Sequence, residues 1–370
     1  MSYGDVADSE ENPFPGKLFN RPTPDGVAGY DVNEGCVLSY KGEDVTASNF
    51  LAVLKGDNKT TGGKPVLQST KHDRVFVYFA DHGGIGLVAM PVGDPVYAPD
   101  LIDALRFMKS NDRYLELVFY MEACESGSMF EGLLPTDANI YATTAANSME
   151  SSYGTYCGGD SIINGTVVGS CLGDLYSVNF LENSDRPSMF HTETLDSQFA
   201  LVKNETSKSH AQKFGTIGMG KDLVALFLGA AGFPSVSGED QVFAPMPKNG
   251  VNSRNIKLHA LRYERDRRSG NDAQALEGTI AEELAMRSQT SRRFKEIMIR
   301  TSGGRFVPPL TGVFTKHACL KTSSSAFISA CCAWNDFSLA YVRSLATLCQ
   351  AGYSELEIIS SIQAACLVDT

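Results

Sequence analysis

The stretch Arg74-Val-Phe-Val-Tyr-Phe-Ala-Asp-His-Gly-Gly84 is an apolar run that stops at an acidic residue, a histidine and two glycines. Apolar side chains on both faces are typical of a buried strand in a parallel sheet. A second run, Leu115 to Met121, ends shortly before Cys124, and a third covers Ile140 to Ala145. Between the first two, Pro99 to Ser110 has the apolar spacing of a helix. The pattern predicts an α/β fold with a mostly parallel sheet flanked by helices.

The composition around this pattern is that of an ordinary globular protein. The chain has 370 residues, of which 43% are hydrophobic and 20% charged, so disorder throughout and a fibrous repeat are excluded. At about 150 residues per domain, this length suggests two or three domains. The net charge of −11 argues against a nucleic-acid partner. The longest apolar run, Leu223 to Phe233, is too short for a transmembrane segment.

His82 and Cys124 follow neighbouring strands that are joined by one crossover helix. A right-handed crossover places both strand ends at one edge of the sheet, where open α/β sheets bind ligands. There an imidazole can take the proton of a thiol, and the thiolate can attack a carbonyl. Gly83 and Gly84 allow a sharp turn, and their N–H groups could hold the developing oxyanion. A lone cysteine is usually a buried small residue, but the joint placement favours a catalytic pair.

Two other chemistries fit these residues less well. A metal site needs further histidine or cysteine at short spacing, and neither His82 nor Cys124 has such a neighbour. A serine nucleophile would be expected in Gly-x-Ser-x-Gly, which Glu125-Ser-Gly127 does not match. We therefore expect no metal and no cofactor.

Cysteines and glycosylation sequons indicate an oxidising, secretory route. The last quarter of the chain holds a dense group of cysteines, as stapled secreted modules do. Three Asn-x-Ser/Thr sequons point the same way, although Met1 to Ala7 lacks the basic and apolar regions of a signal peptide. The cysteines of the last quarter are Cys319, Cys331, Cys332, Cys349 and Cys366, and the sequons begin at Asn58, Asn164 and Asn204.

Several motifs resemble those of legumain, the asparaginyl endopeptidase family of caspase-like cysteine peptidases. The resemblance covers essentially the whole chain. It implies a caspase-like fold and a thiol protease that hydrolyses peptide bonds after asparagine, or after aspartate, through an acyl-enzyme. The matching stretches are Tyr78 to Gly84, Val118 to Met129, Tyr141 to Asn147, Glu150 to Tyr153 and Gly173 to Ser177, with Asn12 to Gly16 and Gly42 to Asp57 upstream.

The resemblance assigns roles to individual residues. It implies that His82 is the catalytic histidine, that Cys124 is the nucleophile and that the Gly83 N–H lies in the oxyanion hole. It also implies that Glu125 and Asp174 line the pocket for the substrate asparagine, whose amide N–H groups suit acceptors such as carboxylates. The residues that would flank the strand on which the peptide pairs are Ser151 and Ser152.

The resemblance also divides the chain into three parts. Residues 1–253 would be the caspase-like peptidase domain, and 254–305 a basic linker and activation helix with 12 basic and 7 acidic residues. Residues 306–370 would be a helical, cysteine-rich prodomain that caps the active site as an inhibitor. Processing would follow Asn271, just before a long helix expected over Asp272 to Arg300.

Disulfides are expected in two places. Four cysteines alone allow three pairings, and the family pattern implies Cys319–Cys349 and Cys331–Cys366 in the prodomain. Cys157 and Cys171 bracket a loop before Asp174 that resembles a disulfide loop of plant legumains. Cys332 is an extra thiol, and the sequence assigns no role to it or to Cys36.

Family members carry a strand and a helix before the region that matches Ser2 to Ala7. The resemblance therefore implies that the first βα unit is absent here, together with the asparagine that orients the histidine and the arginine of the pocket. Without that arginine we expect uncompensated pocket carboxylates and weakened asparagine recognition.

The expected partners are polypeptide substrates, the chain's own prodomain and cystatin-type inhibitors, in a lysosome, a vacuole or outside the cell. Two alternatives remain at this point. One is a catalytically impaired isoform or decoy. The other is a catalytic subunit of the GPI transamidase type, which would carry a membrane anchor in place of the cysteine-rich tail.

Overall fold

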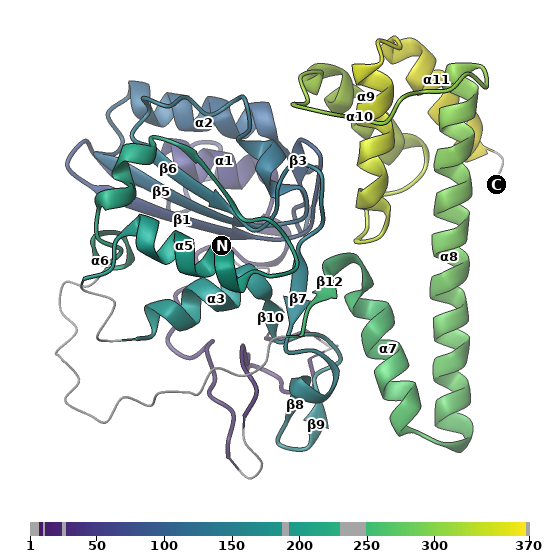
Figure 1. The fold of residues 1–370 in the computed structure, drawn as a ribbon, viewed down its shortest axis with the longest axis horizontal. Helices are drawn as coiled ribbons and strands as arrows, with labels where there is room; N and C mark the ends of the chain where they lie inside the picture. Colours follow the sequence, from purple (N-terminus) through teal and green to yellow (C-terminus); the bar gives the residue numbers. More distant parts are fainter. Residues whose placement is uncertain (1–6, 10–11, 24–26, 187–191, 230–248, 368–370) are drawn as a thin grey trace.

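The computed structural model describes residues 7–9, 12–23, 27–186, 192–229 and 249–367 (Figure 1). Its centre is a four-stranded sheet in the order β1-β5-β6-β11. Strands β1 (Arg74–Ala80), β5 (Glu116–Glu122) and β6 (Ile140–Thr144) are parallel, and β11 (Gln212–Gly215) is antiparallel to β6. The predicted mostly parallel sheet is confirmed. The fourth, antiparallel strand was not predicted.

Helices cover both faces of this sheet (Figure 1). Side chains of β5 alternate between two cores: Leu117 and Phe119 pack with helices α1 (Ala47–Lys55) and α2 (Ala98–Ser110), whereas Val118 and Tyr120 pack with α3 (Leu175–Ser184) and α5 (Leu195–Glu205) on the other face. This alternation is the period of two that a strand imposes. The strand β1 lies at an edge of the described sheet, where Tyr78 is 40% exposed, so it is less buried than its apolar sequence predicts.

Local signals explain where these helices begin and end. The Thr46 side chain accepts a hydrogen bond from the Asn49 N–H at the start of α1, and Gly56 ends α1 in the left-handed conformation. Both are standard capping arrangements. In α2, Pro99 stands in the first turn, where its missing N–H leaves no helical hydrogen bond unmade.

Short strands surround the carboxyl edge of the sheet. Three small sheets have the strand orders β2-β3-β4, β10-β7-β12 and β8-β9. Their strands are β2 (Gly83–Gly84), β3 (Leu87–Val88), β4 (Val96–Tyr97), β7 (Tyr153–Thr155), β8 (Ile162–Ile163), β9 (Thr166–Val167), β10 (Gly173–Asp174) and β12 (Val251–Asn252). The remaining short helices are α6 (Ala225–Leu228) and the 3-10 turns Gly42–Asp44, Ser126–Met129, Gly158–Ser161, Ile217–Lys221, Ser253–Asn255 and Ser338–Tyr341.

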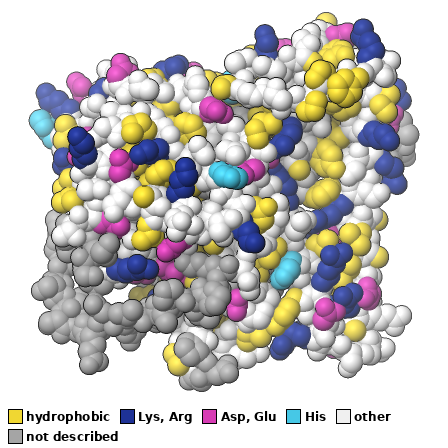
Figure 2. Space-filling model, in the orientation of Figure 1, with side chains coloured by type: hydrophobic (Ala, Val, Ile, Leu, Met, Phe, Trp, Pro, Cys, Tyr) yellow, Lys and Arg dark blue, Asp and Glu magenta, His cyan; other side chains and the backbone are white. Residues whose placement is uncertain are grey.

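The C-terminal part is helical and packs beside the sheet domain (Figure 1). It consists of α7 (Ile256–Arg267), α8 (Gly270–Ser302), α9 (His317–Ala330), α10 (Val342–Gln350) and α11 (Glu355–Cys366). Figure 2 shows many basic side chains on the surface over α7 and α8. No helix of the described ranges is both long and apolar enough to cross a membrane.

One apolar cluster joins the two parts of the molecule. Ile85 and Leu87 from the sheet domain pack in the same core as Leu320 and Val342 of the C-terminal helices. At its rim, the Lys321 Nζ lies 2.8 Å from a carboxylate oxygen of Asp100. The C-terminal helices are therefore held against the sheet domain by buried apolar surface as well as by charge.

Candidate active site

The sheet register brings His82 and Cys124 to the same edge. Ala80 of β1 pairs with Glu122 of β5, so His82 and Cys124 each stand two residues beyond that last pair. Both side chains line a cavity of about 240 Å³. Its other lining residues are Ala80, Asp81, Glu122, Ser152, Ser170, Cys171, Gly173, Asp174, Ser253 and Ile256.

Gly83 packs directly against the backbone of Cys124. A Cβ atom on Gly83 would lie 2.3 Å from the Cys124 carbonyl oxygen, so no other residue fits here without a shift of the backbone. On the Cys124 side, Glu125 has a φ of +50°, an uncommon left-handed conformation for a residue with a side chain. This pair of features makes the tight turn that presents Cys124 next to the His82–Gly83 turn.

The Cys124 thiol is buried, with 1% of the residue exposed. The Ser152 N–H donates to its Sγ over 3.3 Å. Burial raises the pKa of the thiol, and Glu125 acts in the same direction, whereas Arg254 opposes them. In this capped state the thiol is therefore held in its protonated, weakly nucleophilic form.

The His82 imidazole lies beside the C-terminal part. Its Nε2 is 3.9 Å from an Asp336 carboxylate oxygen, and the Arg254 Nη1 donates to the Asp336 carbonyl over 3.1 Å. The loop that follows α9 thus lies against the His82 side of the cavity.

Three carboxylates line the cavity, and two of them were not predicted: Asp81, which stands beside His82, and Glu122. Asp174, which was predicted to line the substrate pocket, lines this cavity; it is half-buried, and burial raises its pKa to about 6. Glu122 is 2% exposed. Burial raises the pKa of Glu122 well above its usual range, and repulsion by Asp174 adds to this effect. The period of two along a strand could have identified Glu122, because it and Cys124 are two positions apart and face the same side.

Glu125, predicted to line the pocket with Asp174, is not among the residues around the cavity. Its left-handed backbone turns the side chain toward two arginines: Arg254 Nη2 is 2.6 Å from Oε2, and Arg343 Nη2 is 3.0 Å from Oε1. The expectation that this carboxylate is uncompensated was wrong. Burial still raises the pKa of Glu125 against the effect of the two arginines.

The edge of β7 beside the cavity is occupied by the chain itself. Val251 and Asn252 pair antiparallel with Gly154 and Tyr153, and the Ser253 N–H donates to the Ser152 carbonyl over 3.1 Å. Nearby, the Ser151 hydroxyl accepts a bond from the Arg254 Nε over 3.4 Å. Ser151 and Ser152 thus flank a strand edge of the kind that pairs with extended peptides, but here it is paired with β12.

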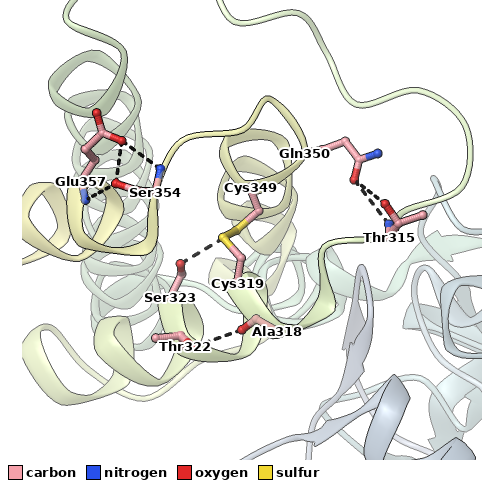
Figure 3. Close-up of a disulfide and its surroundings, with 9 residues drawn as sticks. All are labelled: Thr315, Ala318, Cys319, Thr322, Ser323, Cys349, Gln350, Ser354 and Glu357. Atoms are coloured by element: carbon pink, nitrogen blue, oxygen red, sulfur yellow. Dashed lines mark hydrogen bonds between the residues drawn. A yellow bond between two sulfur atoms is a disulfide. The ribbon is translucent and has the colours of Figure 1, made fainter.

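Three disulfides are present in the described part of the chain. Cys157–Cys171 lies beside the cavity, and Cys319–Cys349 and Cys331–Cys366 join the C-terminal helices. Figure 3 shows Cys319–Cys349 between α9 and α10, near the Ser354–Glu357 capping box that begins α11. Cys36 and Cys332 are exposed thiols.

Asn271 does not precede the long helix as predicted. The helix α8 begins at Gly270, so Asn271 is an exposed residue of its first turn. The first N–H groups of a helix have no partner within it, and helix ends fray, so this turn can open at low cost.

Comparison with known proteins places these features in a wider context. Residues 1–230 match the model of the peptidase C13 family, and residues 305–366 match the legumain prodomain. The chain is 34% identical to a "Vacuolar-processing enzyme" of Vicia sativa, over 98% of this chain and 77% of the relative. It is 36% identical to "Legumain" of Mus musculus, over 99% of this chain and 83% of the relative. It is 46% identical to a "Hemoglobinase" of Schistosoma japonicum, over 70% of this chain and 57% of the relative.

Proposed function

The chain belongs to the peptidase C13 family of cysteine endopeptidases and carries a legumain prodomain, and we propose that it is a zymogen whose active form cuts peptide bonds after asparagine. The observation that carries the proposal is the single cavity lined by His82, Cys124, Glu122 and Asp174. It combines a nucleophile, a base and two acceptors for an amide in one space.

In the proposed mechanism, the catalytic pair works in two stages. His82 takes the Cys124 proton, and the thiolate attacks the substrate carbonyl carbon. The backbone N–H groups of Gly83 and Cys124 stabilise the oxyanion of the tetrahedral intermediate. His82 then gives its proton to the leaving amine, which leaves a thioester on Cys124. A water molecule, deprotonated by His82, hydrolyses that thioester and restores the thiol.

The two carboxylates support selection of asparagine. A carboxylate only accepts hydrogen bonds, and the asparagine side chain offers two N–H donors. At a pH where Glu122 and Asp174 are both ionised, they would repel an ionised aspartate. Since the pKa of Asp174 is about 6, acidification protonates it and lowers the penalty for aspartate.

Latency in this proposal comes from the chain's own C-terminal part, acting as inhibitor, together with the strand β12 that precedes it. Arg343 of α10 holds Glu125, Asp336 lies against His82, and β12 fills the edge of β7. Acidification neutralises Glu125 and weakens its contact with Arg343, so release is favoured in an acidic compartment. We place the protein's action in a vacuole or lysosome, in keeping with the name of its Vicia relative.

The test uses the full chain, brought to acidic pH and then given peptides with a single asparagine. The proposal expects cleavage after that asparagine, with little cleavage of a glutamine-substituted control peptide. A covalent asparagine-directed probe should label Cys124. A decoy without catalysis, the alternative, would neither cleave the peptide nor take up the probe.

A further inference from the structure

We propose that Ser177 and Tyr78 are positioning residues that fix the Glu122 carboxylate in the substrate pocket, an inference that rests on the proposed function. The three residues come from different elements: Tyr78 from β1, Glu122 from β5 and Ser177 from α3. They form a chain of hydrogen bonds that runs from the partly exposed edge of the sheet to the pocket.

Ser177 donates twice to the same oxygen of Glu122. Its N–H lies 3.0 Å and its Oγ 2.8 Å from Glu122 Oε2. Ser177 is the third residue of α3, so its N–H has no partner within the helix and is free to bind an external acceptor. The amino end of a helix also favours a negative charge.

Tyr78 determines which way the serine hydroxyl points. Its phenol OH donates to the Ser177 Oγ over 2.7 Å. Because the tyrosine proton occupies the acceptor side of that oxygen, the serine proton is directed to Glu122. The Tyr78 ring is itself held against Phe180, with 5.3 Å between the ring centroids.

These bonds hold one oxygen of the Glu122 carboxyl, Oε2, and leave the other, Oε1, as a possible acceptor for a substrate. Glu122 Oε1 is buried and makes no hydrogen bond to any residue that the structure describes. The cavity that Glu122 lines is where a substrate amide would enter. Anchoring Oε2 therefore leaves Oε1 as the acceptor for the substrate N–H, at a fixed position.

The same contacts influence when Glu122 carries its charge. Burial and repulsion by Asp174 on β10 raise its pKa; the two bonds from Ser177 and, after them, the nearby Ser152 hydroxyl oppose that rise. Two further titratable groups interact with Glu122, namely Tyr78 on β1 and Tyr176 on α3. Removing the Ser177 hydroxyl should raise the pKa of Glu122 further and allow its side chain to rotate.

The test compares Ser177→Ala and Tyr78→Phe in the acid-activated full chain. Matched controls are Ser184→Ala on the same helix, whose hydroxyl donates to the Phe180 carbonyl and accepts from the Gln198 side chain, and Tyr114→Phe, whose hydroxyl donates to the Ala138 carbonyl. We expect KM for an asparagine peptide to rise about tenfold in Ser177→Ala and about threefold in Tyr78→Phe, since a hydrogen bond that holds the Glu122 carboxyl in place is lost or weakened.

Further readouts separate positioning from a structural role. The acidic limb of kcat/KM should move to higher pH in Ser177→Ala, and Ser177→Thr should restore it. Alkylation of Cys124 by iodoacetamide should keep its rate, because the thiol is not touched. If Ser177→Ala fails to fold, Tyr78→Phe carries the test, because it removes only one oxygen atom at a half-exposed site. A wild type that cleaves after asparagine, with both variants unchanged in KM and pH profile, would overturn the proposal.

A final measurement needs no substrate and so remains informative if asparagine cleavage itself is absent. The Glu122 carboxyl can be titrated by NMR in a Cys124→Ala chain with labelled glutamate. Ser177→Ala should shift this titration to higher pH. An unshifted titration contradicts the positioning role, whereas a shifted titration without asparagine cleavage would count against the proposed function alone.

Discussion

Replacing Arg343 by alanine removes one of the links between the C-terminal helices and the carboxyl edge of the sheet. The Arg343 Nη2 donates to Glu125 Oε1 over 3.0 Å and to the Met149 carbonyl over 2.6 Å. Glu125 is 5% exposed at its side chain, whereas Arg343 is 38% exposed. The change therefore removes charge-assisted hydrogen bonds whose acceptor, Glu125, is buried and whose donor, Arg343, is partly exposed to solvent.

The magnitude follows from these contacts. A bond to a charged group contributes roughly 1.5–3 kcal/mol when buried, and exposure of the arginine reduces this. Glu125 keeps Arg254 at 2.6 Å, so no buried charge is left alone and the larger penalty of about 3–5 kcal/mol does not arise. We expect a loss of about 1–2 kcal/mol, which is about a 5- to 30-fold rise in the open fraction of the zymogen.

The assay is the rate at which a peptide electrophile with asparagine labels Cys124 in the intact chain at neutral pH. Mass spectrometry confirms that the chain has not been cut during labelling. The rate should rise 5- to 30-fold in Arg343→Ala and stay constant in Arg300→Ala, which removes an exposed arginine of α8 that pairs with Glu296 on the same helix. Equal rates for Arg343→Ala and the unmodified chain would refute the role of this ion pair in latency.

Three further predictions concern backbone fit, pH and processing. Gly83→Ala should abolish turnover, since the new Cβ would clash with the Cys124 carbonyl oxygen. The control Gly278→Ala, in open space on α8, should leave turnover unchanged and raise the melting temperature slightly. Turnover by Gly83→Ala would contradict this packing. The pKa of Asp174 is raised from 3.8 to about 6, so the folded state binds this proton more tightly than the unfolded state does. The protonated carboxyl therefore stabilises the fold at low pH, and this stabilisation is lost as the pH rises from 4 to above 6. Asp174→Asn in a Cys124→Ala chain should therefore flatten the fall in melting temperature over that range, and an identical pH profile would count against the shift. Asn271→Gln should shift or block maturation, and mass spectrometry that finds the same mature end in both proteins would exclude processing at Asn271.

The parts of the fold that depend on local patterns could be predicted from the sequence. The run from Arg74 to Ala80 forms β1 over those same residues, and the apolar spacing after Pro99 forms α2. The strand β11 has four residues, of which only Phe214 is apolar, and β12 has only two residues. Neither is long or apolar enough to show the alternation from which a strand is predicted. Their pairing depends on neighbours that are distant in the sequence.

The site likewise combines residues whose place follows from local sequence patterns with contacts between residues that are far apart in the sequence. The strand ends at His82 and Cys124 were predictable from the crossover topology. The partners of Glu125 were not, because Arg254 and Arg343 are 129 and 218 positions away in the chain. Glu122 was missed for a different reason. The prediction took the residue next to Cys124 in the sequence, Glu125, whereas alternation along β5 places Glu122, two positions before Cys124, at the cavity.

Cys124 and His82 form the proposed catalytic pair, and this is tested by the turnover of a single-asparagine peptide by acid-activated Cys124→Ala and His82→Ala chains. Both must first be shown to melt like the unmodified protein. Cys124→Ala should retain less than about a thousandth of the activity, because no other group is placed to form the thioester, and His82→Ala should be nearly as inactive, since the pair acts as a unit. Cleavage after asparagine by Cys124→Ala at a substantial fraction of the unmodified rate would contradict the assignment of the nucleophile.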